Sequence, residues 1–238
     1  MIRLYVESQL FENQELMLIE NQSHYLQKVM RLKEGDEVLF FNGVDGEWKA
    51  RIIETLKKTT RLHLISQMRS QQHEGDLWLL FSPLKPKRQE FLVEKATELG
   101  VSRLCPLHFE RTSVPKVNLE KMRNHTVEAA EQCGRLTIPE IKPLTSLSML
   151  LKSWPQDRTL LFGDESLSSP SLGTLNLNFQ KPYAFLVGPE GGFTSQEFSL
   201  LRSFPQAQGV MLNLHILRAE TAALVGISYL QVNFIDIR

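Results

Sequence analysis

The sequence predicts an α/β protein made of a small N-terminal β-barrel and a larger C-terminal domain in which helices cover a parallel sheet. Residues 1–70 contain several short strand-like runs separated by turn residues. Residues 77–238 alternate apolar strand-like runs with helical stretches, which is typical of a mostly parallel sheet. The polar segment 71–76 between them has no periodicity and is the expected linker.

In the N-terminal part, short strands are expected over 3–7, 16–20 and 38–41. Two more are expected over 47–53 and 61–66, because apolar and polar residues alternate there. Asn42-Gly43 and Asp45-Gly46 are turn sequences. A helix is expected over 24–32, since Ser23 can accept hydrogen bonds from the first-turn amides.

In the C-terminal part, Thr194 and Glu197 have the spacing of a capping box, so a helix is expected to begin near Ser195. The stretch 164–181 has no clear period and is expected to be a loop with a short helix or strand. The remaining strands are expected over 77–81, 104–108, 159–162, 184–187 and 210–212, and the remaining helices over 89–99, 119–133 and 220–234.

Composition restricts the class of protein. Hydrophobic residues make up 42% of the 238 residues, and no apolar run approaches the length of a membrane span. The start of the chain resembles a strand rather than a signal peptide, and Cys105 and Cys133 lack metal-ligand spacing. We therefore expect a soluble cytoplasmic protein without a metal. The net charge is zero, so any contact with nucleic acid must come from local clusters of basic residues.

Two stretches, 186–197 (LVGPEGGFTSQE) and 212–223 (LNLHILRAETAA), have the pattern of ligand loops between a buried strand and a helix. The first contains three glycines, which allow positive φ and close approach of a ligand. Neither nucleotide fingerprint is present, and Glu190 and Glu220 would repel a polyphosphate, so a neutral or cationic ligand fits better. The alternative is a tight turn followed by an ordinary buried helix start.

These loops resemble the C-terminal signature of the RsmE family, the 16S ribosomal RNA (uracil-N3)-methyltransferases of the SPOUT superfamily. Further blocks follow in family order, so the resemblance covers nearly the whole chain: HYLQKVMRLKEGD over 24–36, FLVEKATELG over 91–100, RLCPLHFERTS over 103–113 and EQCGR over 131–135. The resemblance implies a PUA-like RNA-binding barrel, a SPOUT domain with a C-terminal trefoil knot, a homodimer, and 16S ribosomal RNA or the small ribosomal subunit as partner.

The resemblance also implies S-adenosylmethionine as the cofactor, and its cationic sulfonium agrees with the two acidic loops. The residues expected to bind it lie at the ends of three strands and at the start of the last helix. They are Leu161, Phe162, Gly163, Leu186, Val187, Gly188, Pro189, Glu190, Gly191, Gly192, Leu212, Asn213, Leu214, Ile216, Leu217, Thr221 and Ala222.

Methylation at N3 of uracil requires removal of a proton and stabilisation of the resulting anion. Glu190 and Glu220 are candidate bases, and Arg218 is the candidate cation. In the structural alternatives, Glu220 only caps helix amides, Arg218 pairs with Glu220, and Glu190 orients Arg218. His215 is a further candidate for handling the proton.

Basic residues in both predicted domains are candidate RNA contacts, although surfaces of mixed charge are commonly only solvated. The set implied is Lys28, Arg31, Lys33, Lys85, Lys87, Arg88, Arg111, Arg135 and His215, with Lys49, Arg51, Lys57, Lys58 and Arg61 as further cations on the barrel. Asn213-Leu214-His215 departs from the family pattern; Asn tolerates left-handed backbone angles, so we expect the turn to survive.

Three other functions remain open from the sequence. A knotted RNA-binding protein without activity is favoured only by the altered segment 213–215. A generic nucleotide-dependent enzyme is favoured only by the glycine-rich loop. A ribose 2′-O-methyltransferase is the nearest chemistry among SPOUT relatives.

Overall fold

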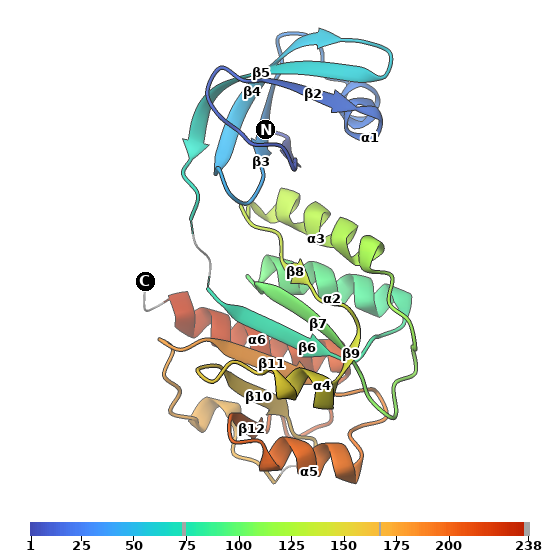
Figure 1. The fold of residues 1–238 in the computed structure, drawn as a ribbon, viewed down its shortest axis with the longest axis vertical. Helices are drawn as coiled ribbons and strands as arrows, with labels where there is room; N and C mark the ends of the chain where they lie inside the picture. Colours follow the sequence, from blue (N-terminus) through green and yellow to red (C-terminus); the bar gives the residue numbers. More distant parts are fainter. Residues whose placement is uncertain (73–74, 167, 236–238) are drawn as a thin grey trace. The chain divides into compact units, whose positions relative to one another are not determined.

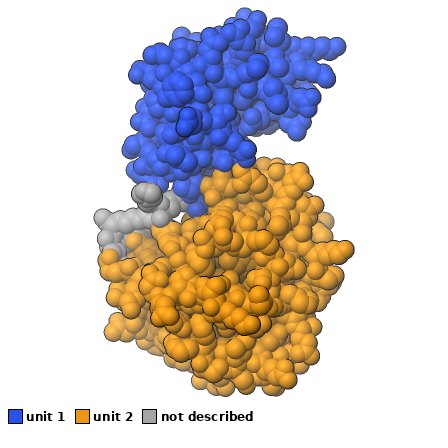
Figure 2. Space-filling model, in the orientation of Figure 1, with its two compact units in different colours: residues 1–73, 130–137 blue, residues 74–129, 138–238 orange. Residues whose placement is uncertain are grey.

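The structure, a computed structural model, describes residues 1–72, 75–166 and 168–235 and divides the chain into two compact units (Figure 1). The first unit comprises residues 1–73 with 130–137, and the second comprises 74–129 with 138–238, as coloured in Figure 2. The division falls inside the expected linker, 71–76, of which residues 73 and 74 lie outside the described part. The sequence places 130–137 in the second domain, whereas the structure groups this segment with the first unit.

The first unit is built on a five-stranded sheet in the order β1, β3, β4, β5, β2. β1 pairs with β3 in parallel, and the other pairs are antiparallel. Alternate residues such as Val38, Phe40, Leu62 and Leu64 are buried in one core, which is why the period-2 pattern locates these strands within a few residues. The strands are β1 (Arg3–Tyr5), β2 (Glu15–Ile19), β3 (Glu37–Phe41), β4 (Glu47–Thr55) and β5 (Thr59–Arg69).

The helix of this unit begins before Ser23, so the prediction of Ser23 as its N-cap is wrong. α1 (Glu20–His24) continues into the π-helical turn η1 (Tyr25–Val29). The buried Ser23 hydroxyl lies 2.8 Å from Thr60 Oγ1 on β5. Gln27 Nε2 donates to the carbonyls of Leu56 (2.9 Å) and Thr59 (3.1 Å) in the β4–β5 turn. The Ser23 side chain, which the sequence pattern assigned to capping, therefore bonds to the sheet instead.

A buried carboxylate ties segment 130–137 to the first sheet. Glu47 is only 4% exposed, and its Oε1 lies 2.5 Å from Arg3 Nε and 2.7 Å from Arg69 Nη2. Arg69 also donates to the carbonyl of Gly134 at 2.9 Å. Arg3 donates to three carbonyls at and beyond the end of α3 (Leu119–Cys133), those of Ala130, Glu131 and Arg135. These guanidinium groups occupy carbonyls that the helix end leaves without partners.

The second unit contains a seven-stranded sheet in the order β12, β10, β11, β6, β7, β8, with β9 beside β7. Every recorded pair in it is parallel. The strands are β6 (Leu77–Phe81), β7 (Arg103–His108), β8 (Glu140–Ile141), β9 (Thr145–Ser146), β10 (Thr159–Gly163), β11 (Tyr183–Val187) and β12 (Ala207–Val210).

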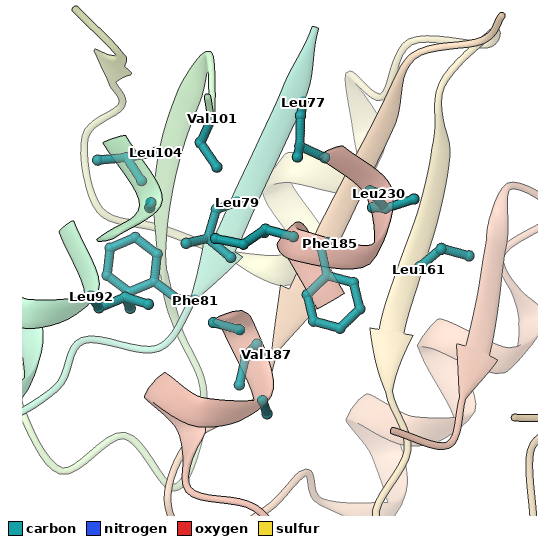
Figure 3. Packing of buried hydrophobic residues seen from close by; sticks show 14 of the residues in the cluster. Leu77, Leu79, Phe81, Leu92, Val101, Leu104, Leu161, Phe185, Val187 and Leu230 are labelled. Carbon is teal, nitrogen blue, oxygen red and sulfur yellow. The ribbon is translucent and has the colours of Figure 1, made fainter. Parts of the chain in front are cut away.

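Helices cover both faces of this sheet. Leu79 and Phe185 on one face pack with Leu92 of α2 and Leu230 of α6 (Figure 3). Leu80 on the other face belongs to a second cluster that includes residues of α4 and α5. Burial on both faces explains why these strands are continuous apolar runs. Besides α3, the helices are α2 (Pro86–Glu98), α4 (Leu147–Lys152), α5 (Ser195–Ser203), α6 (Ala219–Ile235) and the 3-10 turn η2 (Leu172–Thr174).

The sequence misplaces or misses the shortest elements. β12 spans Ala207–Val210 rather than 210–212, and β8, β9 and α4 have no counterpart among the predicted elements. The turn η2 lies in the 164–181 stretch, where a short element was expected. In the described part of the chain, none of the helices has both the length and the apolarity needed to cross a bilayer.

We expect the stability of the first unit to depend on pH through Glu47. Burial raises the pKa of Glu47, but hydrogen bonds from Arg69 and Arg3 outweigh it and hold the pKa below the ordinary 4.5. The stabilisation is therefore present above about pH 4.5 and is lost as pH falls through the lower, folded value. Glu47→Gln should reduce the free energy of unfolding at pH 7 by about 3 kcal/mol. The free energy of unfolding of the variant, measured by urea denaturation over a pH series, should also fall less steeply at acid pH. A fall as steep as in the wild type would contradict this role.

Candidate active site

A cavity of about 290 Å³ lies in the second unit, where β10 and β11 end and the segment after β12 begins. Ligands of open parallel sheets bind at the carboxyl ends of the strands, beside the point where the strand order reverses. Here β10 and β6 lie on opposite sides of β11. Three segments line the cavity together with Arg88 of α2: residues 163–165, residues 187–190 with 192 and 193, and residues 212, 213, 215–219 and 222.

The helix after the glycine-rich loop begins as its sequence predicts, whereas Gly192 is the only one of the loop's three glycines with a positive φ. Thr194 Oγ1 accepts from the Glu197 amide at 3.3 Å, and Glu197 Oε2 accepts from the Thr194 amide at 2.8 Å, so the predicted capping box is confirmed. Gly192 has a φ of +72°, and an added Cβ would lie 2.2 Å from Glu165 Oε1. At Gly188 an added Cβ would lie 2.8 Å from the Phe193 ring. This loop therefore requires glycine at both positions.

The segment before α6 keeps its turn by a different route from the one expected. Asn213 is not among the non-glycine residues with positive φ in the described chain, so the expectation that its turn relies on a left-handed Asn is wrong. Instead Asn213 Oδ1 accepts from the His215 amide at 3.2 Å, a local side-chain turn typical of Asn. His215 and Ile216 line the cavity, whereas Leu214 does not.

Two acidic residues after β10 contribute to the cavity and were missed in the sequence. Asp164 is buried, and its carboxylate accepts from the Ser166 amide (2.8 Å) and from the hydroxyls of Ser166 and Ser169 (both 2.6 Å). Burial raises the pKa of Asp164, but these hydrogen bonds hold it below its ordinary value. Glu165 is exposed and lies against Gly192. Both residues directly follow a parallel strand, which was the signal that could have identified them.

The charged residues of the cavity are paired differently from any predicted arrangement. Arg88 forms a close ion pair with Glu190, and its Nε lies 3.6 Å from Glu220 Oε1. Glu220 is buried beside the cavity and is not among the residues that line it, and its Oε2 has no hydrogen-bond partner in the described residues. Arg218 lines the cavity and is exposed, and over the described chain its side chain has no recorded ion pair. The alternative in which Arg218 pairs with Glu220 is therefore not what the structure contains.

Of the residues expected to bind a cofactor, most line this cavity. Gly191, Leu214 and Thr221 lie outside its lining, and Leu161, Phe162 and Leu186 are buried in the sheet core. The lining includes eleven of the expected residues: Gly163, Val187, Gly188, Pro189, Glu190, Gly192, Leu212, Asn213, Ile216, Leu217 and Ala222.

The expected RNA contacts do not form one set. Lys85 and Lys87 are exposed at the start of α2, and Lys28, Arg31 and Lys33 are exposed on the first unit. Arg111 donates to the carbonyl of Gly191 at 2.9 Å, so it holds the glycine-rich loop. Arg135 is only 8% exposed and donates to Thr137, which contradicts its expected place on an exposed basic surface.

Residues 71–231 match the family model described as an RNA methyltransferase domain. The chain belongs to this RNA methyltransferase family. Residues 18–61 additionally match the model of an RNA methyltransferase PUA domain, which lies within the first unit. The small β domain and the parallel α/β domain that the sequence predicts are therefore both present in the expected order.

Named relatives and solved structures agree over nearly the full chain. The ribosomal RNA small subunit methyltransferase E of Rickettsia conorii is 31% identical over 233 residues, covering 97% of this chain and 95% of the relative. The Synechocystis protein of the same name is 33% identical, covering 97% and 77%. The Neisseria gonorrhoeae enzyme of that name, bound to S-adenosyl methionine, has a TM-score of 0.89 at 27% identity and 98% coverage of both chains. A putative methyltransferase from Legionella pneumophila with bound SAM has a TM-score of 0.87 at 29% identity, covering 98% and 97%.

Gly192→Ala should destabilise the second unit, because it places a side chain at positive φ and against the Glu165 carboxylate. We expect a loss of about 1–3 kcal/mol in the free energy of unfolding, measured by urea denaturation. Gly173→Ala is the matched control, since an added Cβ there meets nothing within 4 Å. Equal effects of the two substitutions would show that the loop tolerates a side chain.

Proposed function

We propose that this protein is a cytoplasmic homodimer with a C-terminal trefoil knot that methylates N3 of a uridine in 16S ribosomal RNA, using S-adenosylmethionine. The observation that carries the proposal is the cavity between the glycine-rich loop and the segment before α6. It lies at the ends of parallel strands, in a chain whose solved relatives from Neisseria gonorrhoeae and Legionella pneumophila hold this donor.

The residues of the cavity fit such a donor. Leu212, Leu217 and Ala222 line the cavity and supply an apolar wall for a flat ring. Glu165 has no recorded ion pair in the described chain, so its carboxylate is available to a positive charge. When bound, S-adenosylmethionine supplies a methyl group on a positively charged sulfur.

The protein's own residues then act on the uracil. The N3–H group must lose its proton to an acceptor held within hydrogen-bond distance. We assign this role to one of the two carboxylates, Glu190 or Glu220. The negative charge that remains on the uracil requires a cation, and Arg218 lines the cavity with its guanidinium unpaired in the described chain. We assign a contact with the nucleotide to His215, which belongs to the same lining.

Methyl transfer to small-subunit RNA followed by digestion to nucleosides tests this function. We expect 3-methyluridine, with Arg218→Ala lowering kcat by about 100-fold, since removal of one anion-stabilising donor has an effect of this size. Methylation on the ribose would establish the 2′-O alternative. Donor binding without any methylated nucleoside would indicate a non-catalytic RNA-binding protein, and absence of donor binding in calorimetry would exclude the cofactor.

The cations of the first unit fall into two classes. Lys49 and Arg51 both pair with Glu37, and Arg61 pairs with Glu15 and Glu54. Five others have no recorded ion pair in the described chain: Lys28, Arg31, Lys33, Lys57 and Lys58. The hydrogen bonds of Gln27 to the β4–β5 turn bring the helix end and this turn together. We assign RNA phosphate contacts to the unpaired class.

The two classes predict different salt dependence. The double variant Lys57→Gln with Lys58→Gln should weaken RNA binding and reduce the slope of log affinity against log salt by about 1.4, or about 0.7 for each lost phosphate contact. Lys49→Gln with Arg51→Gln removes the same charge from ion-paired positions and should leave the slope unchanged. Filter binding over a salt series measures both. Equal slopes for the two double variants would refute the assignment.

A further inference from the structure

We propose that Phe91, with Lys87 beside it on α2, forms a stacking site for an RNA base next to the target uridine. This inference rests on the proposed function and adds a contact outside the cavity. The occupant is a single-stranded stretch of the substrate RNA. The Phe91 ring holds the flat face of the base, and the Lys87 ammonium group holds a phosphate of the same strand.

The reaction requires an unpaired RNA strand at the cavity. N3 of uracil carries the proton that is donated in a Watson–Crick pair, so methyl transfer to N3 needs a uridine that is not paired. The cavity of about 290 Å³ is at the lower end of the volumes that hold one small ligand. Neighbouring nucleotides therefore lie on the surface around the cavity, and proteins commonly hold such unstacked bases on aromatic side chains.

Phe91 is the aromatic residue that the second unit presents to solvent. It is 42% exposed, whereas every other described Phe, Tyr and Trp residue of this unit is buried or half-buried. Its helix neighbours Leu92 and Val93 are buried in the sheet-facing cluster. Phe91 therefore points away from the core, on the side of α2 that is available to a ligand.

Helix geometry places the Phe91 ring near the edge of the cavity. Phe91 follows Lys87 by four residues and Arg88 by three, the spacings at which side chains on a helix are neighbours. Side chains of an α-helix lean toward its N-terminus, so the ring lies over the turn that carries these two residues. Arg88 lines the cavity. A base stacked on Phe91 is therefore about one helix turn, or 5 Å, from a residue of the cavity wall.

The charges around Phe91 complement RNA. Lys85 and Lys87 are exposed and have no recorded ion pair in the described chain. The acidic neighbour Glu90 has its Oε2 3.9 Å from Lys121 Nζ on α3, which offsets its charge. An exposed ring beside unpaired cations matches a strand of stacked bases and phosphates.

Filter binding to small-subunit ribosomal RNA over a salt series tests the site. Phe91→Ala should weaken binding by about 10-fold without changing the slope of log affinity against log salt, because stacking releases no counterions. Lys87→Gln should weaken binding and reduce this slope by about 0.7, the value for one phosphate contact to a single strand.

Val232→Ala is the matched control for loss of an exposed apolar side chain. Val232 is 59% exposed on α6 and lies ten residues, or about 15 Å, beyond Ala222, which lines the cavity. This variant should leave both the affinity for RNA and the salt slope unchanged.

Two further substitutions separate stacking from a general apolar contact. Phe91→Trp keeps a flat ring and should bind RNA at least as tightly as the wild type. Phe91→Leu keeps an apolar side chain without a ring and should bind as weakly as Phe91→Ala. In methyl transfer with saturating S-adenosylmethionine, Phe91→Ala should raise KM for RNA by about 10-fold with kcat unchanged, because the contact is made equally before and during the chemical step.

Three outcomes would overturn the inference. Wild-type affinity in Phe91→Ala would show that no base binds there. Wild-type affinity in Phe91→Leu would replace stacking with a general apolar contact. A changed elution volume of Phe91→Ala would make Phe91 a contact between two copies of the chain. A wild-type protein that binds donor and RNA but forms no 3-methyluridine would instead refute the proposed function, and the affinity comparison, which needs no turnover, distinguishes the two failures.

Discussion

The close packing of α6 on β11 is the constraint on which the cavity depends. A Cβ added at Gly226 would lie 2.2 Å from the Phe185 ring, so only glycine lets the helix approach the strand this closely. Ala223 and Leu230 of the same helix are buried in the same hydrophobic cluster as Phe185. α2 packs beside α6, and this contact brings Arg88 to the first turn that carries Glu220.

Short sequence patterns correctly predicted several strands and one helix start. Continuous apolar runs located β6, β10 and β11, because each strand is buried on both faces. The capping box at Thr194 was read correctly since both of its hydrogen bonds lie within four residues. Ser23 fitted the capping rule equally well, but its hydroxyl bonds to that of Thr60 on β5. A short sequence window contains no information on that choice, because the competing partner is distant in the chain.

The contacts of the charged residues also join residues that are distant in the chain, so they could not be predicted from the sequence. Arg88 and Glu190 are separated by 102 positions, and Arg3 and Arg135 by 132, so neither contact follows from helical or strand spacing. Arg135 and Arg88 both resembled surface cations in sequence, yet one is buried in the first unit and the other is ion-paired in the cavity. The identity of the loops could be predicted, since glycine and acidic residues mark them. The partners of their charges could not.

Ion pairing separates cations that shape the protein from cations that are available to a ligand. A cationic side chain already bonded to carboxylates gives up existing interactions before it can bind a phosphate, whereas an unpaired one exchanges only water and counterions. In the first unit this separates Lys49, Arg51 and Arg61 from Lys57 and Lys58. In the second unit it separates Arg88 from Arg218. The same criterion therefore selects the cations that we propose to contact RNA in one unit and to stabilise the anion in the other, from contacts within each unit alone.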